Sequence, residues 1–162
     1  MFKIGDIIVY GAQGICKITS TETKQIGKVS AEYFVLSPIF SDNTSLFVPV
    51  QNEKLVSRMQ PVLTVDEANS LIAAAPDTDV LNIKDETQKR EEYKNILASN
   101  DRHKLLSLIK TICVEKDFRR EHGKKLNIND EQTLRKAELL LYNELGFVLN
   151  IDPKEVKGII KL

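Results

Sequence analysis

The chain has 162 residues, of which 42% are hydrophobic and 28% are charged, and its 23 basic residues balance its 23 acidic ones. These values are typical of a soluble protein with one or two small domains, and no apolar run approaches the roughly 20 residues that span a bilayer. The sequence shows no charged leader followed by an apolar core, so we expect a cytoplasmic protein.

Residues 1–62 have the pattern of short β-strands separated by turn residues, such as those at 26–28 and 41–45. Five short strands in about 60 residues predict a small SH3- or Tudor-like β-barrel. The predicted strands are apolar, β-branched runs at 7–10, 15–19, 32–36 and 46–50, with a short fifth strand at 55–56.

From Thr64 onwards the pattern changes to that of helices. Thr64 and Glu67 form a capping box for a helix that ends at Pro76, and the loss of the β pattern near residue 62 marks a domain boundary. Residues 63–162 are therefore expected to form an all-α helical bundle, which makes the chain a two-domain α+β protein. Its further helices are predicted over 84–98, from 102 to a C-cap at Gly123, after a cap at Asn129, and from Pro153 through Ile160.

Basic residues gather at the end of the helix that begins at residue 102. Its apolar stripe thins beyond Cys113, so this end is expected to project from the bundle. Residues 102–125 carry eight basic against three acidic residues, a net charge of +5, whereas residues 63–80 carry four acidic residues and no basic one. The basic cluster consists of Lys116, Arg119, Arg120, Lys124 and Lys125.

This cluster has two interpretations. The cations can simply complement the dipole at a solvated helix end. Alternatively, they contact the phosphates of a nucleic acid, in a sequence-independent and salt-sensitive manner worth about 0.9 per contact in the slope of log affinity against log salt. A handful of such contacts predicts weak binding to bare DNA, as suits a factor that meets DNA already held by another protein.

Catalytic and metal-binding patterns are missing from the sequence. It contains no glycine-rich phosphate loop, no GxSxG and no HExxH, and neither His103 nor His122 has a ligand at helical spacing. Cys16 and Cys113 lie among aliphatic neighbours and are interpreted as small buried hydrophobes. We therefore expect a protein that is not an enzyme and needs no cofactor or metal.

Several motifs resemble the CarD family of bacterial transcription regulators, whose barrel is shared with transcription-repair coupling factor. The opening F-x-x-G-D-x-x-V-Y-x-x-x-G-x-x-x-I, which covers residues 2–18, resembles the start of that family, as do 32–36 and 46–50. In the second half, Tyr93-Lys94 with 97–101 resembles the family's Y-K-x-x-L-x-S-G-D. Residues 134–145 resemble its K-A-x-x-x-L-x-x-E-L.

The resemblance implies a monomer that binds RNA polymerase and, through it, promoter DNA. The barrel would dock on the lobe of the polymerase β subunit by its edge strand, with Lys24, Leu46, Phe47 and Val48 as the contact residues. Phe47 could instead belong to the core, and relatives often have arginine there. The helical domain would contact backbone phosphates at the upstream edge of the promoter bubble and stabilise the open complex. Its expected DNA-binding residues are Lys89, Arg90, Lys116, Arg119, Arg120, Lys124, Lys125 and Lys136.

Many relatives insert a tryptophan as a wedge at the bubble edge, but this chain has no tryptophan. The corresponding position falls at Leu81, Asn82 and Ile83, or at Glu86. Aliphatic side chains can unstack a base step but offer less stacking area than an indole, so we expect weaker stabilisation of the open complex. The rival interpretation is a protein-only adaptor with two protein interfaces; the missing tryptophan favours it, and the basic cluster opposes it.

Overall fold

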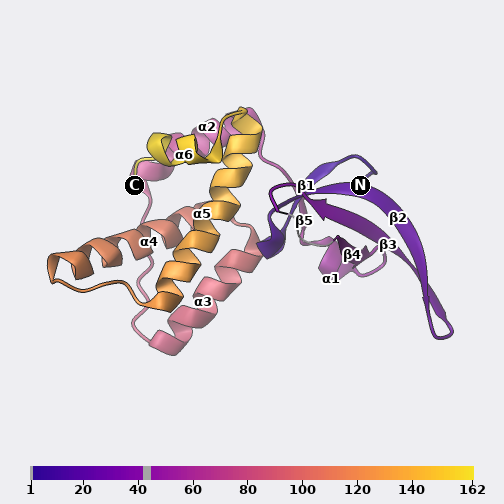
Figure 1. Ribbon diagram of the computed structural model, residues 1–162, viewed down its shortest axis with the longest axis horizontal. Helices are drawn as coiled ribbons and strands as arrows, with labels where there is room; N and C mark the ends of the chain where they lie inside the picture. Colours follow the sequence, from indigo (N-terminus) through magenta and orange to yellow (C-terminus); the bar gives the residue numbers. More distant parts are fainter. Residues whose placement is uncertain (1, 42–44) are drawn as a thin grey trace. The chain divides into compact units, whose positions relative to one another are not determined.

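The computed structural model describes residues 2–41 and 45–162, which form a sheet followed by helices (Figure 1). The chain divides into two compact units, Met1–Val62 and Leu63–Leu162. A five-stranded antiparallel sheet followed by a helical region confirms the predicted α+β architecture. None of the helices in the described part of the chain is long and apolar enough to cross a membrane.

The sheet has the strand order β4-β3-β2-β1-β5, so β4 and β5 are its two end strands. Every strand contributes side chains to one apolar core, which includes Ile8, Ile18, Leu36, Val48 and Met59. The strands are β1 (Ile7–Tyr10), β2 (Ile15–Ile26), β3 (Val29–Pro38), β4 (Leu46–Pro49) and β5 (Met59–Pro61), with a 3₁₀ turn, η1 (Gly11–Gln13), between the first two.

Strands β2 and β3 are much longer than the sequence pattern indicates, and Figure 1 shows them as a long curved hairpin. Residues 21–30 are all exposed, so the outer half of this hairpin lacks the alternation of apolar and polar residues from which a strand is predicted. The two strands meet at a two-residue turn, in which Gly27 has φ +64°, a conformation that favours glycine. The turn predicted at 26–28 is therefore confirmed.

The predicted fifth strand is wrong. Residues 55–56 belong to a short helix, α1 (Glu53–Val56), whose start is capped by the Asn52 side chain accepting from the Leu55 N–H. The fifth strand is instead β5, which pairs with β1. Of the polar turn predicted at 41–45, residues 42–44 lie outside the described residues.

The helical unit encloses one core, built from α2, α3, α4, α5 and α6. The capping box at Thr64 and Glu67 is present and confirmed, and the last helix is capped by Asp152, whose side chain accepts from the Lys154 N–H. The helices are α2 (Val65–Ala74), α3 (Glu86–Ser99), α4 (Arg102–Glu121), α5 (Ile128–Leu149) and α6 (Pro153–Ile159), with the 3₁₀ turn η2 (Ala75–Asp77) after α2.

Two predicted helix ends need correction. The cap of α5 is Asn127 rather than Asn129, because the Asn127 side chain accepts from the Asp130 N–H at 2.8 Å. At the end of α4 the cap is His122, and Gly123 follows it with φ +68°. The N–H groups of Gly123 and Lys124 donate to the carbonyls of Arg120 and Arg119, which makes this end a Schellman motif.

A buried ion pair ties three parts of the helical unit together. The Arg102 guanidinium, at the start of α4, donates twice to the Glu144 carboxylate of α5, at 2.8 and 2.6 Å. Glu144 is only 1% exposed, and its carboxylate also accepts from the Leu63 N–H at 3.0 Å. This carboxylate therefore fixes the first residue of the unit as well as the packing of α4 on α5.

The thiol of Cys16 lies in the sheet core, and burial raises its pKa to about 11. It is then almost entirely protonated at pH 8, so we expect native protein to resist alkylation at Cys16 by iodoacetamide. Adding denaturant should expose the thiol and restore ordinary reactivity, which mass spectrometry of the modified peptides can measure. Rapid labelling of Cys16 in the native state would contradict this burial.

Candidate interaction surfaces

Strand β4 is an end strand of the sheet, and its pairing with β3 shows which backbone groups it leaves free. The Val50 N–H donates to the Glu32 carbonyl, and the register continues as Val48 opposite Phe34 and Phe47 opposite Val35. Because bonded and non-bonded pairs alternate along an antiparallel ladder, the N–H and C=O of Phe47 point away from β3. Pro49, two residues further on, also has its backbone directed away from β3, so its lack of an N–H removes no hydrogen bond between β3 and β4.

The predicted polymerase contacts separate into a surface pair and a buried part. The Lys24 ammonium lies 3.3 Å from the centroid of the Phe47 ring, and Phe47 is 41% exposed, so it is not a core residue. Leu46 is half-buried and Val48 is 1% exposed. The side chain of Val48 therefore packs in the core and is not accessible to a binding partner.

Two of the predicted DNA-binding residues line one groove between α3 and α5. Arg90 of α3 and Lys136 of α5 lie in this groove, whose volume is about 420 Å³, together with Lys94 of α3. Asp130, Gln132 and Thr133 also line it, so three basic residues face one acidic residue. Sequence reasoning missed Lys94 as a site residue, although its spacing of four from Arg90 places both on one side of a helix. We call this the cationic groove.

Lys89, the third predicted DNA-binding residue on α3 and α5, is engaged in an ion pair within the protein. Its ammonium lies 3.0 Å from the Asp130 carboxylate, and the two side chains are only 18% and 10% exposed. Asp130 also accepts from the Asn127 side-chain amide at 3.0 Å. Lys89 thus joins α3 to the start of α5, and its charge is largely neutralised within the protein.

The basic cluster at the end of α4 is exposed apart from Arg119, which is half-buried, and two of its arginines are paired with carboxylates. No residue of α4 beyond Ile112 is buried. Arg119 bonds Glu115 at 2.8 Å, and Arg120 bonds Asp117 at 3.0 Å. Within the described residues no ion pair involves Lys116, Lys124 or Lys125, so these three lysines are the cations that a polyanion meets first.

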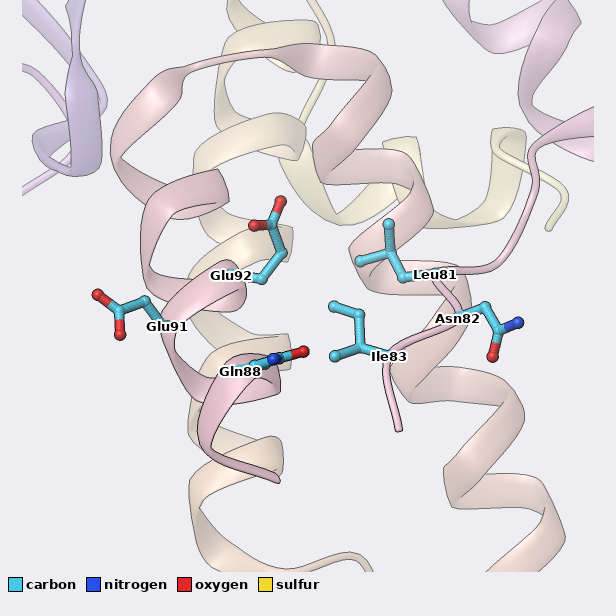
Figure 2. Close-up of a pocket in the computed structure, with 6 residues that line it drawn as sticks. All are labelled: Leu81, Asn82, Ile83, Gln88, Glu91 and Glu92. Atoms are coloured by element: carbon cyan, nitrogen blue, oxygen red, sulfur yellow. The ribbon is translucent and has the colours of Figure 1, made fainter. Parts of the chain in front are cut away.

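The predicted wedge residues lie beside a second groove of opposite character, about 430 Å³ in volume (Figure 2). Leu81 and Ile83 point towards α3, and Asn82 points away from it. Leu81 and Ile83 are half-buried, and the Leu81 N–H is held by the Thr111 hydroxyl at 2.8 Å. These two side chains are therefore packed rather than presented as a free wedge. The lining is completed by Gln88, Glu91 and Glu92 of α3, and we call this the acidic groove.

The outward N–H and C=O of Phe47 are the kind of edge to which an extended segment of a partner can add as a further strand. Within the described residues no group of three side chains could hold a metal ion. Residues 2–62 match the family model of the CarD-like/TRCF RID domain. The N-terminal unit is therefore a CarD-like domain of the type that interacts with RNA polymerase.

Proposed function

We propose that this chain is a non-enzymatic transcription regulator that docks on the lobe of the RNA polymerase β subunit and contacts promoter DNA at the upstream edge of the bubble. Through these two contacts it modulates the stability of the open complex. The observation that carries the proposal is the match to the CarD-like/TRCF RID domain over a sheet whose end strand turns the backbone groups of Phe47 away from β3. A strand of the partner would pair with this edge, beside the Lys24–Phe47 pair.

The DNA contact rests on the cationic groove and on the free lysines at the end of α4. Arg90, Lys94 and Lys136 line a groove that would follow a phosphate backbone, and Lys124 and Lys125, which lie between α4 and α5, add two further cations. Five phosphate contacts give a salt slope of about 4.5, so binding to free DNA is weak and sequence-independent. Docking on the polymerase supplies the high local concentration that makes such contacts effective.

Neutralising this surface is expected to shorten the lifetime of open complexes. Replacing Arg90, Lys94, Lys124 and Lys125 by glutamine removes up to four phosphate contacts, each worth about 0.9 in salt slope. Open-complex lifetime should fall and depend less steeply on salt, as measured by filter binding after a heparin challenge. Affinity for the β lobe should not change.

The matched control replaces Lys154 and Lys161 by glutamine. Lys154 belongs to α6, which lies at the far end of α5 from the cationic groove (Figure 1). This variant should keep the wild-type lifetime. An unchanged lifetime in the groove variant, with polymerase binding intact, would favour the protein-only adaptor. The carboxylates of the acidic groove are the observation that supports that second candidate.

A further inference from the structure

Helix α3 sorts its charges between two grooves. Arg90 and Lys94 line the groove shared with α5, whereas Glu91 and Glu92 line the groove beside the segment that precedes α3. Figure 2 shows Glu92 on the side of that segment and the Glu91 carboxylate directed away from it. One helix therefore presents a positive surface on one side and a negative surface on the other. A phosphate backbone suited to the first groove is repelled by the second, so the acidic groove calls for a different occupant.

The acidic groove is a formed site rather than a gap beside a loose loop. The segment before α3 is tied to α4 by two anchors: the Leu81 N–H bonds Thr111, and the Lys110 ammonium bonds the Thr78 carbonyl. Leu81 and Ile83 then supply an apolar wall opposite α3 (Figure 2). Sites of this kind lose little freedom when they are filled.

We propose that the acidic groove binds a basic segment of protein, an arginine or lysine next to an apolar side chain, within the polymerase–promoter complex. This inference rests on the proposed function, because it places the partner in the same assembly. It makes the helical unit a two-sided element, with DNA against α5 and protein against the segment before α3.

Charge and shape both favour this occupant. Within the described residues no ion pair involves Glu91 or Glu92. The Glu92 carboxylate is therefore available to a partner's cation in the groove, and the Glu91 carboxylate, which points away from Leu81 and Ile83, adds negative charge on the outer side of α3 (Figure 2). A guanidinium matches a carboxylate with two parallel N–H donors, and Leu81 and Ile83 can pack against its methylene stem or a neighbouring apolar side chain. Gln88 adds an amide at the rim that can accept or donate.

Site-specific photocrosslinking in complexes of purified RNA polymerase and promoter DNA tests the proposal. With p-benzoylphenylalanine at Gln88 of the full chain, we expect a crosslink to a polypeptide, at a segment that contains arginine or lysine. The charge-reversing pair Glu91→Lys and Glu92→Lys should lower the yield roughly tenfold, and Glu91→Gln with Glu92→Gln should lower it less. Glu91 is exposed and Glu92 is half-buried, and circular dichroism checks that the helices are intact.

The same probe at Arg90, on the other side of α3, is the matched control and should crosslink DNA. A Gln88 crosslink to DNA, a crosslink to a segment without basic residues, or a yield that charge reversal does not change would each overturn the inference. So would the absence of a Gln88 crosslink while the Arg90 probe still reaches DNA, and this result would leave the proposed function standing. Failure of the chain to bind polymerase at all would instead overturn both.

Discussion

Replacing Glu144 by alanine is expected to lower the free energy of unfolding of the helical unit by about 3–5 kcal/mol, because it removes one partner of a buried ion pair. The Glu144 side chain is 2% exposed and accepts two bonds from the Arg102 guanidinium, so the loss leaves a desolvated cation without its carboxylate. It also removes the acceptor of the Leu63 N–H. Urea titration followed by circular dichroism at 222 nm measures the change.

The control for this experiment is a second ion pair in the same unit. Glu138 lies 3.9 Å from Lys157, whose side chain is largely exposed, so replacing Glu138 by alanine should cost less than about 1 kcal/mol. The paired change Arg102→Met with Glu144→Leu should recover much of the loss, since apolar side chains of similar size can replace a buried pair. A cost for Glu144→Ala no larger than that for Glu138→Ala would show that the buried pair is not what holds α4 on α5.

Local signals in the sequence predicted the helical unit well, because its elements are set by neighbours in the chain. The capping box of α2 needs only Thr64 and Glu67, which lie three residues apart. Sheet boundaries depend on partners elsewhere: the outer half of β2 and β3 is exposed on both faces, and β5 exists because β1 pairs with it. The aliphatic residues Leu55 and Val56 are of types common in strands, but they lie in a helix whose N-cap is Asn52.

In the interaction surfaces, too, the features that depend on residues distant in the sequence could not be predicted. Lys24 and Phe47 were both named from the resemblance, but only the fold brings the ammonium over the ring. The pairing of Lys89 with Asp130 joins residues 41 positions apart, and no local pattern announces it. Sorting the charges of α3 into two grooves likewise requires knowing which neighbours lie on each side, and the sequence of residues 89–94 alone does not supply this.

Replacing Phe47 by proline is expected to lower affinity for the isolated β-subunit lobe by at least about tenfold, while leaving the sheet folded. The N–H of Phe47 points away from β3, so proline removes a donor that only a partner strand would use. Losing that bond, and placing a ring where the partner's backbone must approach, accounts for about 1.4 kcal/mol or more. Titration of the lobe in a calorimeter measures the affinity.

Two further variants separate the backbone from the side chain. Phe47→Ala keeps the outward N–H but removes the ring that Lys24 contacts, so its affinity should fall less than that of the proline variant. Leu46→Pro instead removes an N–H that faces β3, and it should destabilise the sheet itself, which circular dichroism detects. If Phe47→Ala lowers the affinity as much as Phe47→Pro does, the contact is made by the Lys24–Phe47 surface rather than by strand pairing.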